Sequence, residues 1–217
     1  MITSTLTTRV LLADDHCMVR QGLAEILGHD ERLVVVGQVG SGPEAIELAA
    51  QLQPDVLVVD YSMPGMDGAE VARQMVQQHP DIGVLLLSIH ENVHYAVNAL
   101  QAGAMAYVVK SDTAEELVEA IRQVASGRNY VSSRLSSAVA QHLSTPHRQR
   151  GSLDQLSPRE FELLRWLARG QPLKECAKMM NISESTASTY RQRVVGKLGL
   201  DSTAGLIRFA LEHGIDG

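Results

Sequence analysis

The chain has 217 residues, of which 45% are hydrophobic and 20% charged, and its formal net charge is −6. This composition excludes a disordered chain, and the length admits one large domain or two small ones. Apolar runs are too short to cross a bilayer, and residues 1–8 lack the basic-then-apolar pattern of a secretion signal. We therefore expect a cytoplasmic protein without a membrane partner.

The charge is divided unevenly along the chain. Residues 1–149 carry a net charge of −8, and residues 150–217 carry +2. An acidic part joined to a mildly basic part suggests two domains with different tasks, one of which involves a polyanion. Cys17 and Cys176 are far apart and have no metal-binding or redox spacing. We expect both cysteines to be small buried apolar residues.

The first part of the chain alternates apolar runs with helical stretches. Apolar runs typical of strands buried on both faces occupy residues 10–13, 33–36, 56–59, 84–87 and 105–109. Helical patterns fall near residues 17–28, 43–52, 67–78, 91–102 and 113–126. This alternation predicts an α/β domain over residues 1–127, a doubly wound, flavodoxin-like (βα)5 parallel sheet with helices on both faces.

Polar residues stand directly after four of these apolar runs. Asp14 and Asp15 follow the first, Asp60 the third, Ser88 the fourth and Lys110 the fifth. Groups just past the carboxyl ends of parallel strands converge on one crevice. Three carboxylates stay ionised together only around a cation, and a few hard oxygen ligands suit Mg²⁺. With a lysine and a hydroxyl nearby, one carboxylate could accept a phosphoryl group as a nucleophile.

Residues 128–153 differ in character and are predicted to be a linker. Leu135, Val139 and Leu143 recur at every fourth position, so part of this segment can form a short helix. Its end, near residues 144–151, is polar and typical of a flexible connection.

From Leu156 onward the pattern is helical only. Ser157 and Glu160 form a capping box that opens a helix, and further helices are expected near 173–180, 184–198 and 203–213. Asn181 can adopt the left-handed turn between the second and third helices, which indicates a helix-turn-helix. We expect a small all-α, four-helix domain over residues 154–217.

The helix near 184–198 has a polar outer face that suits the major groove of DNA. The candidate base contacts are Ser185, Ser188, Thr189, Gln192 and Arg193. The candidate phosphate contacts are Arg191 and Lys197, with Lys174 and Lys178 on the preceding helix. Judged from these residues alone, an ordinary solvated helix explains the face equally well.

The motifs together resemble two known families. Residues 9–127 resemble the receiver domain of two-component response regulators, through LLADDH (11–16), VDYSMPGMDG (59–68), LS (87–88) and GAMAYVVK (103–110). Residues 153–214 resemble the LuxR-type helix-turn-helix, through LSPRE (156–160), KECA (174–177) and the segment from ISESTA (182–187) to KLG (197–199). The whole chain resembles a NarL/FixJ-class transcriptional response regulator.

The resemblance implies a role for each pocket residue. Asp60 would accept the phosphoryl group, while Ser88 and Lys110 would hold its oxygens and Tyr107 would change rotamer with Ser88. The implied Mg²⁺ ligands are Asp14, Asp15, Asp60 and the backbone carbonyl of Ser62. We interpret Asp67, past the turn, as a helix N-cap and not as a ligand.

Two positions of the helix-turn-helix depart from the family pattern. Ser188 stands where members often carry Lys, and Ala187 stands where they carry Val, so no operator sequence is carried over. The segment Thr203–His213 resembles the helix through which these modules dimerise. Core packing alone would also explain its Leu206, Ile207 and Ala210.

The resemblance implies a DNA-binding transcriptional response regulator that is not an enzyme. A sensor histidine kinase would phosphorylate Asp60, and phosphorylation would control dimerisation and binding to double-stranded promoter DNA. RNA polymerase is a further candidate partner. One alternative is a phosphorylation-independent regulator that acts as a constitutive dimer or through a protein partner. Another is an aspartyl phosphatase, which would need a general acid and a lid that the sequence has no insertion to supply.

Overall fold

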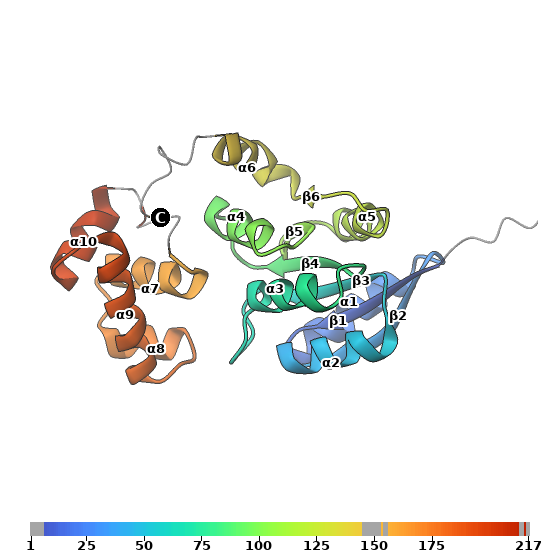
Figure 1. The fold of residues 1–217 in the computed structure, drawn as a ribbon, viewed down its shortest axis with the longest axis horizontal. Helices are drawn as coiled ribbons and strands as arrows, with labels where there is room; N and C mark the ends of the chain where they lie inside the picture. The colour runs from blue at the N-terminus through green and yellow to red at the C-terminus, as the bar shows by residue number, and fades with distance from the viewer. Residues whose placement is uncertain (1–6, 145–152, 154–155, 213–214, 216–217) are drawn as a thin grey trace, which may run out of the picture. The chain divides into compact units, whose positions relative to one another are not determined.

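The computed structural model describes residues 7–144, 153, 156–212 and 215. The chain divides into two compact units, Met1–Leu143 and Ser144–Gly217 (Figure 1). Among the described residues, no helix combines the length and the apolar character that crossing a bilayer requires.

A parallel sheet forms the centre of the first unit, with strand order β2-β1-β3-β4-β5-β6. The strands are β1 (Thr8–Ala13), β2 (Leu33–Val39), β3 (Val56–Asp60), β4 (Gly83–Ser88), β5 (Ala106–Val109) and β6 (Tyr130–Val131). Strands β3, β4 and β5 are buried at every position, as expected for strands covered on both faces. The predicted doubly wound fold is confirmed, and the second strand runs three residues further than the sequence indicated.

Five helices cover the two faces of the sheet (Figure 1). They are α1 (Cys17–Gly28), α2 (Gly42–Leu52), α3 (Gly68–Gln78), α4 (Val93–Gln101) and α5 (Ala114–Ala125). Apolar residues of α1 and α5 share one core with β1, β3, β4 and β5, including Leu27, Val58, Leu85 and Ile121. Asp67 accepts a hydrogen bond from the backbone N–H of Glu70 at 2.8 Å, which confirms that it caps α3.

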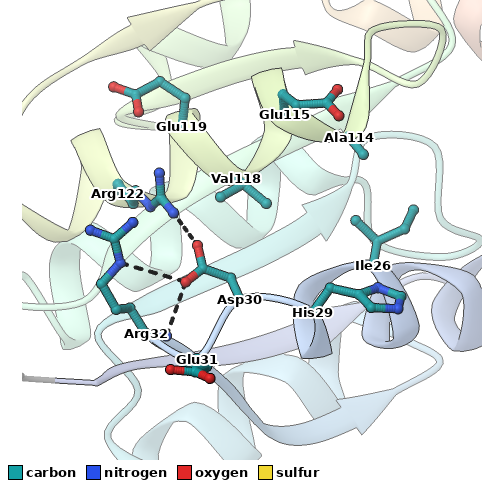
Figure 2. Close-up of a pocket in the computed structure, with 10 residues that line it drawn as sticks. All are labelled: Ile26, His29, Asp30, Glu31, Arg32, Ala114, Glu115, Val118, Glu119 and Arg122. Atoms are coloured by element: carbon teal, nitrogen blue, oxygen red, sulfur yellow. Dashed lines mark hydrogen bonds and ion pairs between the residues drawn. The ribbon is translucent and has the colours of Figure 1, made fainter.

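A groove lies between the end of α1 and one side of α5 (Figure 2). Asp30 forms ion pairs there with Arg122 of α5 and, at 3.6 Å, with Arg32. Ile26 and Val118 line the apolar part of the groove. These contacts tie α1 and α5 together on the same face of the sheet.

The segment predicted to be a linker begins with regular structure. Strand β6 pairs with β5, and α6 (Ser133–Ser144) buries Leu135 and Val139. The ring of His142 on α6 meets that of His94 on α4 edge to face, with centroids 5.5 Å apart. Residues 128–143 therefore pack with the first unit, and the helix expected from the four-residue spacing is present. Residues 145–152, from the stretch predicted to be flexible, lie outside the described residues.

The described residues of the second unit form the expected four helices. They are α7 (Pro158–Ala168), α8 (Leu173–Met179), α9 (Glu184–Leu198) and α10 (Thr203–Glu212). Asn181 adopts a positive φ of 51° in the turn between α8 and α9, and Ser183 caps α9, so the predicted helix-turn-helix is confirmed. Cys176 is buried as predicted. The prediction for Cys17 is wrong, because this first residue of α1 is exposed.

Candidate functional site

The carboxyl ends of four strands bring the predicted pocket residues together. Asp14 follows β1, Asp60 ends β3, Ser88 ends β4 and Lys110 follows β5. The Lys110 Nζ atom lies 2.7 Å from Asp14 Oδ2 and 2.7 Å from Asp60 Oδ1. Side chains separated by up to 96 residues in sequence thus meet at one edge of the sheet.

Electrostatics in this pocket are set by burial of opposite charges. Asp60 is only 5% exposed. Burial raises the pKa of Asp60, and the neighbouring Lys110 ammonium offsets part of that rise. Burial alone would lower the pKa of Lys110, but Asp60 and Asp14 outweigh it, and the pKa is raised above its usual value. The lysine therefore stays charged and balances two buried acidic groups.

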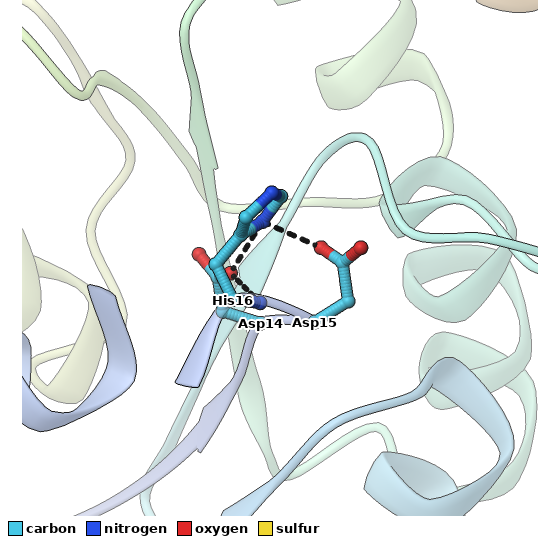
Figure 3. Close-up of side chains that lie close together, drawn as sticks. All are labelled: Asp14, Asp15 and His16. Carbon is cyan, nitrogen blue, oxygen red and sulfur yellow. Dashed lines mark hydrogen bonds and ion pairs between the residues drawn. The ribbon is translucent and has the colours of Figure 1, made fainter. Parts of the chain in front are cut away.

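Asp15 and His16 complete the acidic edge of the pocket (Figure 3). His16 Nδ1 lies 2.9 Å from Asp15 Oδ1 and 3.4 Å from Asp14 Oδ1. Although His16 Nδ1 lies close to it, the buried Asp15 Oδ1 atom accepts no hydrogen bond among the described residues. A buried carboxylate oxygen that accepts no hydrogen bond is an atom that a bound cation would satisfy. The oxygen-rich donor set fits Mg²⁺, which favours carboxylate and carbonyl ligands.

Ser62 and Ser88 are both joined to the pocket by backbone hydrogen bonds. The Ser62 N–H donates to Asp60 Oδ2 at 3.2 Å, while its carbonyl stays a predicted ligand. Ser88 Oγ accepts from the His90 N–H at 3.1 Å. A serine oxygen that accepts a hydrogen bond keeps its own proton to donate. The Ser88 proton can therefore be directed to Tyr107, as it is here, or turn to a phosphoryl oxygen.

Tyr107 is fully buried behind this edge of the sheet. Its hydroxyl donates to the His90 carbonyl at 2.8 Å, and its ring lies edge-on to that of Tyr61, with centroids 6.1 Å apart. Burial raises the pKa of Tyr107, and a hydrogen bond with Ser88 offsets part of that rise. Tyr107 thus points inward here, and its change of rotamer stays a prediction.

Sequence reasoning missed two histidines of this site. His16 contacts the acidic pair, and His90 contacts both Ser88 and Tyr107 through its backbone. The His90 ring also stacks on Tyr95, with centroids 4.0 Å apart. Each histidine lies one or two residues past a predicted strand-end residue, which is the signal that could have found it.

The predicted DNA-reading face belongs to α9. Its inner side buries Ala187 and Val194. The predicted base contacts Ser185, Thr189, Gln192 and Arg193 are exposed, and Ser188 is half-buried. The predicted phosphate contacts Lys174 and Lys178 are exposed on α8, and Arg191 is half-buried.

Lys197, the last predicted phosphate contact, lies in an ion pair within the domain. Its Nζ atom is 2.6 Å from Glu160 Oε2, which belongs to a buried side chain. Glu160 also accepts from the Ser157 N–H at 2.7 Å in the capping box of α7. Lys197 thus ties the end of α9 to the start of α7.

Comparison with known families matches both units. Residues 10–122 match the family described as response regulator receiver domain, and residues 154–210 match bacterial regulatory proteins of the luxR family. The chain therefore belongs to the response regulators that carry a LuxR-type DNA-binding domain. It is a DNA-binding transcriptional regulator and not an enzyme.

Similar proteins match 95% of the chain. Response regulator GacA of Pseudomonas aeruginosa is 35% identical over 95% of this chain and 97% of its own length. Response regulator UvrY of Escherichia coli is 32% identical over 95% of this chain and 94% of its own length.

Among solved structures, RcsB of Salmonella enterica serovar Typhimurium bound to promoter rprA with the phosphomimetic BeF3⁻ is 26% identical. It covers 94% of this chain and 98% of its own, with a TM-score of 0.61. The receiver domain of the putative response regulator NarL from Mycobacterium tuberculosis is 38% identical over 56% of this chain and 98% of its own, with a TM-score of 0.55.

Proposed function

We propose that a sensor histidine kinase phosphorylates this regulator on Asp60, and that phosphorylation controls its dimerisation and promoter binding. One observation carries the proposal: Lys110 Nζ lies 2.7 Å from carboxylate oxygens of both Asp14 and Asp60. A buried carboxylate beside an ammonium and further acidic groups is suited to receive a phosphoryl group together with a cation.

The chemistry would be an in-line transfer between two protein side chains. An oxygen of Asp60 attacks the phosphorus of the kinase phosphohistidine. The P–N bond breaks with its electron pair left on the imidazole nitrogen, and the new P–O bond makes an acyl phosphate. Lys110 then turns from Asp60 to a phosphoryl oxygen, and the Ser88 hydroxyl donates to another.

Mg²⁺ would be held by Asp14, Asp15, Asp60 and the Ser62 carbonyl. When bound, it would neutralise charge on the phosphoryl oxygens. The buried Asp15 Oδ1 atom supports this assignment, because it accepts no hydrogen bond among the described residues although His16 Nδ1 is 2.9 Å away. His16, beside both aspartates, would have to yield to the cation or share its ligands.

Phosphorylation can be tested with a small phosphodonor. Incubation with acetyl phosphate and Mg²⁺, followed by intact mass measurement, should add one phosphoryl group to the wild type and none to Asp60→Asn. Asp67→Asn is the matched control, because Asp67 caps α3 and should leave the phosphoryl gain unchanged. Equal labelling of wild type and Asp60→Asn would contradict the proposal.

Promoter DNA would bind to α9, and a second copy of this chain would dimerise with it through α10. The exposed Gln192 and Arg193 support the first assignment, and the RcsB–promoter structure shows that a similar chain binds DNA. On α10, Leu206 and Ala210 are buried, whereas Leu211 is 51% exposed and offers an apolar contact. We infer that such a regulator acts in the cytoplasm, with RNA polymerase as a further candidate partner.

Phosphorylated and unphosphorylated protein can be compared by light scattering and DNA retardation. We expect phosphorylation to shift the wild type toward dimers and toward tighter DNA binding, and Asp60→Asn to show neither shift. If acetyl phosphate strengthens DNA binding by Asp60→Asn as much as by the wild type, control through Asp60 is contradicted.

A further inference from the structure

A polar cluster joins the start of α6 to the two loops that leave the pocket. We name Glu91, Ser111, Asp112, Ser132 and Arg134 the α6 clamp. Arg134 is the second residue of α6. Its guanidinium lies 2.9 Å from Glu91 Oε1 and 3.0 Å from Asp112 Oδ1, and it donates to Ser111 Oγ at 3.3 Å. Ser111 Oγ in turn donates to Glu91 Oε1 at 2.7 Å.

Asp112 is the buried centre of the α6 clamp. Its side chain is 1% exposed, and its Oδ2 atom accepts from the Val109 N–H at 3.0 Å and from the Ser132 hydroxyl. A carboxylate buried to this extent depends on a cationic partner, and Arg134 provides one through an ion pair with Oδ1, an atom that accepts no hydrogen bond among the described residues. The Glu91 side chain is 53% exposed, and its ion pair with Arg134 contributes less.

Each loop held by the clamp also carries a residue that would bind the phosphoryl group. Ser111 and Asp112 directly follow Lys110, and the Lys110 N–H donates to the Ser88 carbonyl at 2.6 Å. Glu91 directly follows His90, whose N–H donates to Ser88 Oγ and whose carbonyl accepts from Tyr107. Arg134 therefore contacts both loops, and these loops connect it to Ser88, Lys110 and Tyr107.

We propose that Arg134 is a positioning residue for the phosphoryl-accepting pocket. By clamping both loops to α6, it keeps the Ser88 hydroxyl and the Lys110 ammonium where phosphoryl oxygens would meet them. Docking of α6 and retention of the phosphoryl group are then coupled, and the coupling is reciprocal: each strengthens the other. This inference rests on the proposed function of Asp60.

Beryllofluoride, a phosphoryl mimic, allows a direct test on the full chain. Mg²⁺ and beryllofluoride are titrated into wild type, Arg134→Gln and Arg134→Lys, with ¹⁹F resonances as the readout. We expect binding to Arg134→Gln to be about fivefold weaker, at the low end of common coupling energies. Its bound fluorine shifts should also change, because they report the positions of Ser88 and Lys110. Arg134→Lys should recover part of both effects, since it keeps a cation beside Asp112.

Arg128→Gln is the matched control. Arg128 is exposed, and its side chain has no hydrogen bond or ion pair among the described residues. Its substitution removes the same charge without touching the α6 clamp, so affinity and fluorine shifts should equal those of the wild type.

Hydrogen exchange tests the reverse direction of the coupling. In the wild type, beryllofluoride should increase protection of the α6 amides, and in Arg134→Gln it should not. Glu91→Gln, with the more exposed partner, should show a smaller loss of affinity. The double variant of Glu91→Gln and Arg134→Gln should lose little more affinity for beryllofluoride than Arg134→Gln alone, because the two side chains share one contact. This second variant keeps the test decisive if Arg134→Gln folds poorly.

The outcomes separate the two proposals. If wild type binds no beryllofluoride, the proposed phosphorylation of Asp60 fails. If wild type binds it, but Arg134→Gln binds it equally or more tightly with unchanged fluorine shifts, the positioning role of Arg134 is overturned while Asp60 remains the acceptor.

Discussion

Each unit of the chain contains a lysine paired with a buried carboxylate. Lys110 Nζ lies 2.7 Å from Asp60 in the first unit, and Lys197 Nζ lies 2.6 Å from Glu160 in the second. The two pairs differ in what else the carboxylate contacts. Asp60 shares its lysine with Asp14, in a pocket with excess negative charge. Glu160 already accepts from the Ser157 N–H inside a capping box.

The comparison shows how one kind of ion pair serves two purposes. The pocket has more carboxylates than cations. When Lys110 turns to a phosphoryl oxygen, a metal ion can take its place beside the carboxylates, and no charge is left unpaired. At the junction of α7 and α9, Glu160 has one cation, and a DNA phosphate would have to take Lys197 away from it. Lys110 is therefore poised to change partner, whereas Lys197 is held in place.

Removing the pocket lysine should have the largest effect on stability. In Mg²⁺-free buffer, Lys110→Met leaves two buried carboxylates without their lysine, and we expect the first unit to lose about 3 kcal/mol of unfolding free energy. Hydrogen exchange of the β3–β5 amides measures this loss, and added Mg²⁺ should restore part of it. Lys178→Met, which removes an exposed lysine on α8, should leave the first unit unchanged. If hydrogen exchange in Lys110→Met equals that of the wild type, the ion pairs of Lys110 contribute nothing to the stability of the first unit.

Removing the second lysine should have a smaller effect. Lys197→Met leaves Glu160 buried without its cation, but Lys197 is itself 39% exposed. After discounting for this exposure, we expect the second unit to lose about 1–2 kcal/mol of unfolding free energy. Trp166 fluorescence during urea unfolding measures it, with Lys174→Met as the control. If the Lys197→Met variant is as stable as the wild type but binds DNA more weakly, the original prediction that Lys197 contacts a DNA phosphate would hold.

An exposed cation on α9 should act on DNA binding alone. Arg193 is exposed and has no hydrogen bond or ion pair among the described side chains. We expect Arg193→Gln to weaken DNA binding about tenfold, which is about 1.4 kcal/mol, at unchanged stability. Affinity for DNA fragments selected by the wild type measures this loss. Arg169→Gln, an exposed arginine outside α9, serves as the control, and equal losses in both variants would contradict a specific contact.

The smallest effect should be a pH-dependent gain in stability. Burial raises the pKa of Asp60 in the folded state, so the wild type becomes less stable as pH rises through the carboxyl range toward that raised pKa. Asp60→Asn removes this cost. Its melting temperature in Mg²⁺-free buffer should exceed that of the wild type by a few degrees at pH 7, and the gap should close toward pH 4. If the difference in melting temperature between Asp60→Asn and the wild type grows as the pH falls, the predicted direction of the pH dependence is wrong.

Local sequence signals determined much of the fold and of the candidate site. Alternating apolar runs placed the strand ends, and parallel strands bring their carboxyl ends to one edge, so the residue pattern alone groups Asp14, Asp60 and Lys110. The caps Asp67 and Ser157 could also be predicted, because a cap acts on backbone only two or three residues away.

Only the tertiary structure decided the partners of the charged side chains. Lys197 meets Glu160 across 37 residues, and Arg134 meets Glu91 across 43. Strand β6, two residues long, exists because β5 offers it an edge to pair with. A sequence states which charges are present and where local elements begin. Which charges become neighbours depends on how those elements pack, and no short-range pattern records that packing.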